Sequence, residues 1–118
     1  MNTFLAIFTG SPESMARWQA LPADEQARRM AEGLEAWHAW VDRHRESIVS
    51  LGGPLGRTKR VTAAGVADIR NAMGGYTVVQ AESHEAAARL FENHPHFAIF
   101  PGDGVEVMPV LPIPPRQG

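Results

Sequence analysis

The chain has 118 residues, of which 44% are hydrophobic, a net charge of −2 and no cysteine. This length fits a single domain with a core of its own. The lack of cysteine excludes disulfides and thiolate chemistry, and without a long basic block we expect no nucleic-acid partner. No apolar run approaches the roughly 20 residues of a membrane span, and the N-terminus lacks the basic region of a signal peptide. We therefore expect a cytoplasmic protein without membrane contact.

The N-terminal third predicts a strand and two helices. Residues 4–8 are apolar and are followed by Gly10, which is typical of a short buried strand. Ser11 is a suitable N-cap for a short helix that ends near residue 20. A longer helix begins at Pro22 and runs to about residue 46. Its apolar stripe, which we expect to pack on a sheet, consists of Ala27, Met30, Leu34, Trp37 and Val41.

The middle of the chain is rich in turn-forming and polar residues. Residues 51–55, Leu-Gly-Gly-Pro-Leu, indicate a turn or a bulge. Residues 57–62 favour β structure but are polar on both faces, which predicts an exposed or edge strand. Residues 63–72 are compatible with a loop or with a bent continuation of that strand.

The last third predicts a strand, a helix and a final strand. Residues 76–81 form the first strand, and Ser83 is a suitable cap for the helix after it. We expect Pro95 to end this helix, because its ring disfavours helical geometry at the residue before it. The final strand covers residues 105–110. A proline-rich extended tail follows over residues 111–118.

These elements follow the order β-α-β-β-α-β, which is that of a ferredoxin-like domain. The predicted fold is an α+β domain over residues 1–110, with an antiparallel sheet and helices on one face. Because no third layer is predicted, the other sheet face needs a cover. A second copy of the chain is the simplest one, and we expect a homodimer through the open sheet face.

Several short motifs in this order resemble the YCII-related family: Trp37-His38, Gly53-Pro54-Leu55, Gly74-Gly75-Tyr76, Glu85-Ala86-Ala87, His94-Pro95 and Val105-Glu106-Val107. The resemblance implies a dimeric α/β barrel with a pocket between helices and sheet. It implies a small-molecule-binding protein, either a cofactor-independent acid/base enzyme (lyase, isomerase or hydrolase) that uses a pocket histidine, or a non-catalytic ligand-binding or transcription-associated regulatory dimer. The Asp-Gly-Pro-Phe motif of many longer members is absent.

His94 is the first catalytic candidate, as a proton donor or acceptor at the rim of a pocket. It lies on the apolar face of its predicted helix, in the last turn, where the helix dipole stabilises an imidazolium. The alternative is a histidine that hydrogen-bonds the free carbonyl groups at the helix end. The resemblance adds support for a functional role, because family members carry His-Pro or Asp-Pro at this place, and both alternatives stay open.

His38 and Asp42 are the second catalytic candidates. Their i, i+4 spacing allows the carboxylate to orient the imidazole, although such pairs are also common on solvated helix faces. The resemblance implies a pocket histidine on the long helix, near His38.

Arg57, Arg60 and Tyr76 are candidates for substrate binding. The two arginines can hold a carboxylate or phosphate, whereas basic residues more often protect an edge strand from pairing. The Tyr76 hydroxyl can face a pocket or the surface. His84 and His96 do not complete a zinc-binding pattern with His94, and no flavin or nicotinamide motif is present. We therefore expect neither a metal nor a cofactor.

Overall fold

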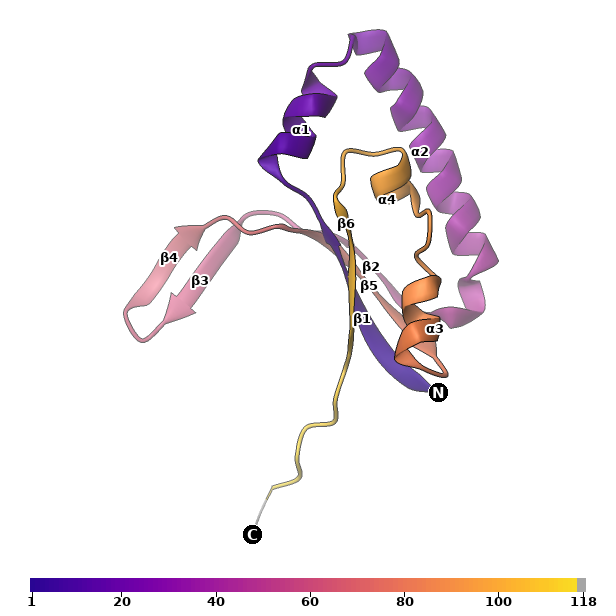
Figure 1. Ribbon diagram of the computed structural model, residues 1–118. Helices are drawn as coiled ribbons and strands as arrows, with labels where there is room; N and C mark the ends of the chain where they lie inside the picture. Colours follow the sequence, from indigo (N-terminus) through magenta and orange to yellow (C-terminus); the bar gives the residue numbers. More distant parts are fainter. Residues whose placement is uncertain (117–118) are drawn as a thin grey trace.

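A computed structural model describes residues 1–116 of the chain (Figure 1). Its elements in chain order are β1 (Asn2–Thr9), α1 (Pro12–Gln19), α2 (Ala23–Arg43), the 3-10 turn η1 (Arg45–Ser47), β2 (Ile48–Pro54), β3 (Thr58–Thr62), β4 (Gly65–Ile69), β5 (Met73–Ala81), α3 (His84–Arg89), α4 (Pro95–Ala98) and β6 (Gly104–Pro109).

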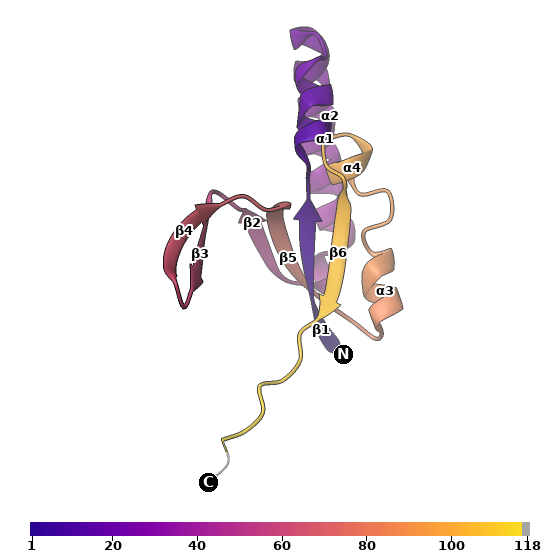
Figure 2. The same ribbon diagram turned by 60° about the vertical axis from the view of Figure 1, so that its left-hand side comes forward.

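The main sheet is antiparallel and has the strand order β2-β5-β1-β6. Helices α2, α3 and α4 lie on one side of it, and the β3–β4 hairpin projects toward the other (Figures 1 and 2). This is the strand order of a ferredoxin-like domain, so the predicted α+β fold class is confirmed. The hairpin is an insertion between two neighbouring strands of that domain.

The core lies between the main sheet and the helices. Phe4 of β1 and Val79 of β5 are paired across the sheet, so their side chains share the helix face. Trp40 of α2 packs on Phe91 with ring centroids 5.1 Å apart, and all four side chains are buried. The indole N–H of Trp40 donates to the carbonyl of Leu90 at 2.8 Å, which fixes α2 to the segment after α3.

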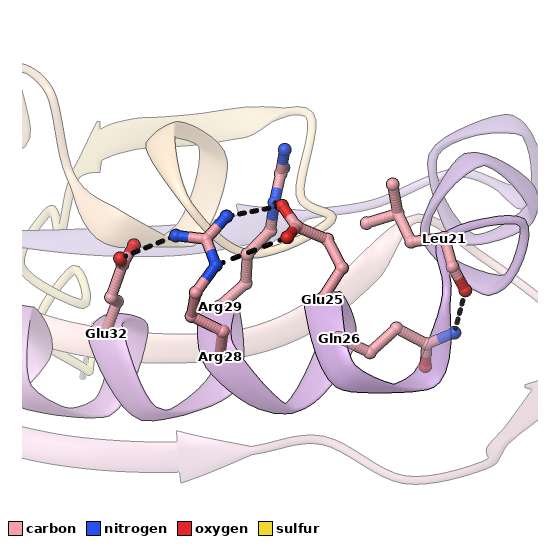
Figure 3. A network of polar contacts seen from close by, with 6 residues as sticks. All are labelled: Leu21, Glu25, Gln26, Arg28, Arg29 and Glu32. Carbon is pink, nitrogen blue, oxygen red and sulfur yellow. Dashed lines mark hydrogen bonds and ion pairs between the residues drawn. The ribbon is translucent and has the colours of Figure 1, made fainter.

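Helix α2 ends at Arg43, earlier than predicted, and its outer face carries a network of ion pairs. Arg28 contacts Glu25 and Glu32, and Arg29 contacts Glu25 (Figure 3). Hydrogen bonds from the two arginines lower the pKa of Glu25. Exposed pairs of this kind contribute little to stability, so packing of the inner face holds the helix in place.

The second strand of the main sheet is not where the sequence predicts it. Residues 58–62 form an exposed strand, but they pair with β4 in a separate hairpin, and β2 occupies the sheet edge. Within β2 the register shifts, and Gly52 has a φ of 67°. The glycines of residues 51–55 therefore form a bulge inside a strand and not a turn. The segment 63–72 is the tip and returning strand of the hairpin.

The segment around His94 also differs from the prediction. Helix α3 ends at Arg89, and a turn with Asn93 at a φ of 55° leads to α4, of which His94 is the N-cap. Pro95 occupies the first position of α4, where its fixed φ and missing N–H are compatible with a helix. The expectation that Pro95 ends a helix is therefore wrong, because this proline begins one.

The chain extends well beyond its core. The hairpin and the segment after β6 both project from the body (Figures 1 and 2), and the radius of gyration is 16.8 Å. A compact domain of this length would have a radius of about 13–14 Å. Residues 111–116 of the predicted tail have no regular structure, and residues 117–118 lie outside the described part. Within residues 1–116, the helices are all too short or too polar to cross a membrane.

Candidate functional site

A cavity of about 380 Å³ lies between α2 and the main sheet. Leu34 and Trp37 of α2 line it on the helix side, and Phe8 of β1 and Thr77 of β5 line it on the sheet side. The other lining residues are Leu51, Gly52, Gly53, Pro54, Gly74, Gly75, Tyr76, His94, His96 and Phe100. The volume is within the range of about 300–1,000 Å³ that is typical of small-molecule sites.

His94 is the most deeply buried titratable side chain of this cavity, with 1% of its surface exposed. Its Nδ1 accepts the backbone N–H of His96 at 3.0 Å, so in the neutral ring the proton must reside on Nε2. That Nε2 is buried and has no hydrogen-bond partner among residues 1–116. His94 thus offers a donor that the described chain does not satisfy.

Burial, together with the nearby His96 and His44, lowers the pKa of His94 to about 4. At neutral pH the ring is therefore uncharged, with Nδ1 as an acceptor and Nε2–H as a donor that residues 1–116 leave unused. The prediction of an imidazolium stabilised by the C-terminal end of a helix is wrong, because His94 lies at the beginning of α4 and not at the end of α3.

His96 lines the same cavity and was not among the predicted site residues. Its Nε2 lies 2.6 Å from the backbone oxygen of Thr9, and because a carbonyl only accepts, this nitrogen carries the proton. The sequence signal was the repeated histidine in His94-Pro95-His96. Sequence reasoning considered His96 only as a metal ligand, since nothing in the pattern shows that β1 and α4 adjoin.

The structure brings only some of the predicted site residues to the cavity. Tyr76 lines it, but the pairing of Tyr76 with Ile7 places the Tyr76 side chain on the sheet face opposite the helices. His38 is exposed on α2 beside Trp37, and Asp42 forms its ion pair with Arg45. Catalytic roles for His38 and Asp42 stay predictions.

Arg60 belongs to the hairpin, Arg57 directly precedes it, and neither residue lines the cavity. Arg57 instead borders a second, open hollow at the hairpin base, together with Lys59, Arg70 and Asp68. Lys59 and Asp68 form an ion pair across the hairpin. Substrate binding by the two arginines stays a prediction, and in this structure it would concern a different surface from that of His94.

Phe100 and Gly33 form a contact that the sequence analysis missed. The Phe100 ring lies so close to α2 at Gly33 that a Cβ on this residue would collide with the ring. A glycine within a helix costs about 1 kcal/mol relative to alanine, so Gly33 in the middle of a predicted helix was a signal of close packing. Its partner could not be named, because Phe100 is distant in sequence.

No family model matches the chain, and no curated protein matches it in sequence. Among solved structures, the chain is similar to the 5-chloro-2-hydroxyhydroquinone dehydrochlorinase TftG from Burkholderia phenoliruptrix AC1100, solved in complex with 2,5-dihydroxybenzoquinone. The two share 20% sequence identity with a TM-score of 0.51, and the match covers 90% of each chain. This likeness shows the fold. Membership in the YCII-related family stays a prediction.

Proposed function

We propose that this protein binds a small, largely apolar molecule in the cavity between α2 and the main sheet, and that Nε2–H of His94 donates to an oxygen of that molecule. One observation carries the proposal: Nε2 is buried, protonated and without a partner among the described residues. A buried donor without an acceptor costs about 1–3 kcal/mol. A ligand oxygen would supply the missing acceptor.

The lining favours a neutral ring compound. Phe8, Trp37 and Phe100 present aromatic surface, and His94 is uncharged at neutral pH. An ionised ligand would lose its hydration without gaining a counter-charge from the lining residues among 1–116. We therefore propose a carbonyl or phenol compound of one or two rings. The compound bound to TftG, 2,5-dihydroxybenzoquinone, is a carbonyl compound of one ring, which supports the ring size and the carbonyl group of the proposed ligand.

We further propose that the cavity serves a cofactor-independent acid/base reaction of the lyase, isomerase or hydrolase type. The support is a histidine in the cavity wall and the dehydrochlorinase activity named for TftG, which has the same fold. The alternative is a ligand-binding or regulatory dimer without catalysis. Such a dimer would still prefer a carbonyl compound to the matching hydrocarbon, but it would not convert the bound compound.

The test compares 2-tetralone with tetralin, two bicyclic molecules that differ in one carbonyl group. We expect wild-type protein to bind the ketone about tenfold more tightly, because satisfying a buried donor is worth more than about 1 kcal/mol. The variant His94→Phe should bind both compounds equally well. Isothermal titration calorimetry gives both dissociation constants.

The matched control is His84→Phe, since His84 is an exposed histidine on α3 outside the cavity lining. This variant should keep the preference for the ketone. Equal wild-type affinity for both compounds, or a preference that survives in His94→Phe, would contradict the proposal.

A further inference from the structure

The two histidines of the cavity are each held by one backbone hydrogen bond, but through different ring nitrogens. His94 accepts at Nδ1 and keeps an Nε2–H, whereas His96 donates from Nε2 to Thr9 and keeps a lone pair on Nδ1. We propose that they act as a donor–acceptor pair on one substrate, in which His94 holds a carbonyl oxygen and His96 removes a proton from the adjacent carbon. The inference rests on the proposed binding at His94 and names the substrate class: carbonyl compounds with an acidic α C–H bond.

The position of the His96 ring leaves Nδ1 as its available nitrogen. Nε2 lies 2.6 Å from the Thr9 oxygen, and Gly102 packs so closely on this side of the ring that a Cβ there would collide with Nε2. The backbone N–H of Gly102 also donates to the His96 carbonyl at 3.0 Å, which fixes the loop against the residue. A flipped ring would point the Cε1–H group at the Thr9 oxygen and lose the hydrogen bond from Nε2.

The Phe8 ring lies next to both imidazole rings. Its ring centroid lies 5.1 Å from that of His94 and 5.2 Å from that of His96, and all three residues line the cavity. A flat substrate packed against Phe8 would lie beside both rings, and in the proposed complex it meets the donor of His94 and the acceptor of His96. This is the arrangement that proton abstraction next to a carbonyl requires, because the negative charge develops on the oxygen while the proton leaves the carbon.

The proposed step balances without any further reactant. His96 Nδ1 takes the α proton, the C–H electron pair forms a carbon–carbon double bond, and the carbonyl π pair moves onto the oxygen, where the hydrogen bond from His94 stabilises the enolate. The imidazolium of His96 exchanges this proton with solvent and returns a solvent proton to the same carbon, which gives exchange, or it returns the proton to a different carbon, which gives isomerisation. In a substrate with a leaving group on the β carbon, the enolate electrons instead expel that group with its bonding pair, which gives elimination.

The experiment follows α-proton exchange of 2-tetralone in D₂O by proton NMR. Wild-type protein should accelerate the loss of the α-proton signal. In His96→Asn the acceleration should fall by about 10²-fold, the typical contribution of a positioned general base, while the dissociation constant for 2-tetralone stays within about twofold. Asparagine is no base, and a second variant, His96→Gln, is likewise no base but places an amide N–H where Nε2 lies and so keeps a donor for the Thr9 carbonyl.

The matched control is His84→Asn. His84 also contacts a backbone oxygen through Nε2, that of Val107 at 2.7 Å, but it lies outside the cavity lining. This variant should exchange 2-tetralone at the wild-type rate. Thermal unfolding and amide NMR spectra establish that these variants are folded.

The outcomes separate this inference from the proposed function. If the ketone binds with the expected preference but His96→Asn exchanges it as fast as wild type, the histidine pair is overturned and the binding site stands. If the wild-type protein shows no preference for the ketone, both the proposed function and the histidine pair fail.

The pH dependence of exchange by the wild-type protein gives a second test. Catalysis by an imidazole base should reach a plateau with rising pH. An exchange rate that rises about tenfold per pH unit without a plateau would overturn the role of His96.

Discussion

At the scale of single residues, the uncharged state of His94 links the cavity to the stability of the whole domain. A histidine that is exposed in the unfolded chain titrates near its ordinary pKa of about 6.5, whereas burial lowers the pKa of His94 in the folded protein to about 4. Between these values the unfolded chain binds more protons than the folded one. Acid therefore favours unfolding over this interval.

We predict that the free energy of unfolding is unaffected by His94 above pH 6.5 and falls as the pH decreases toward 4. One pKa unit corresponds to about 1.4 kcal/mol, so the loss that His94 contributes reaches about 3 kcal/mol at pH 4. Urea unfolding at several pH values, on wild type and His94→Phe, measures it. In the variant, the dependence of the unfolding free energy on pH should lack the contribution of His94.

His44 serves as the internal comparison for this measurement. Burial also lowers its pKa, and so does the neighbouring Arg43, so His44 contributes to the acid sensitivity of both proteins. Only the difference between wild type and variant reports on His94. Parallel curves for the two proteins between pH 6.5 and 4 would show that His94 is protonated in the folded state, against our assignment.

At the scale of elements, helix starts were predictable and two other features were not. Ser11 and Ser83 cap α1 and α3 as expected, because an N-cap acts through a local hydrogen bond. The glycines of β2 were equally compatible with a turn and with a bulge. Only the long-range pairing of β2 with β5 decides between these two structures. Pro95 presents the same problem, since a proline can follow one helix or begin the next.

The candidate site was predictable to a smaller extent than the fold. His94 lines the cavity as expected of a pocket histidine, but its burial, its tautomer and its partner His96 depend on contacts between β1, α4 and the loop before β6. A sequence pattern contains no information on such contacts. For the same reason it suggested Asp42 as the partner of His38, whereas the carboxylate binds Arg45.

The contact between Phe100 and α2 gives a prediction at the element scale. Gly→Ala in a helix normally stabilises by about 1 kcal/mol, but in Gly33→Ala the new methyl group would collide with the Phe100 ring. We predict that Gly33→Ala destabilises the protein by about 1–3 kcal/mol, the usual cost of overpacking. Chemical denaturation measures the difference.

A double-mutant cycle separates the ring from other causes. In the Phe100→Ala background the methyl group has room, and there the same Gly33→Ala change should stabilise the protein, as helix propensity requires. A destabilisation of equal size in both backgrounds would mean that α2 needs the glycine for a reason unrelated to Phe100.

At the scale of the whole molecule, the sheet face opposite the helices is the main uncovered surface. The strand pairings place Leu5 opposite Val78, Ile7 opposite Tyr76 and Leu5 opposite Met108 on this face. None of these side chains is fully buried in the single chain. Apolar residues of this kind in the middle of a sheet are typical of an interface.

We propose that a second copy covers this face, and we predict that wild-type protein is a dimer at micromolar concentration. Val78→Glu should shift it to a monomer, because a carboxylate cannot be buried at the centre of an apolar interface without a partner. Light scattering coupled to size-exclusion chromatography gives the mass. Ala39→Glu, an exposed position on α2, should leave the dimer intact. A monomeric wild type would refute the proposed assembly.

The projecting hairpin also determines how charge is distributed over the molecule. Residues 57–70 carry four basic side chains (Arg57, Lys59, Arg60 and Arg70) and one acidic side chain (Asp68), a net charge of +3. The whole chain has a net charge of −2, so the remaining residues together carry −5. The protein is thus an electric dipole with a small positive arm on a larger negative body. Near an anionic surface at low ionic strength, the electric field of that surface would orient the molecule with its hairpin toward the surface.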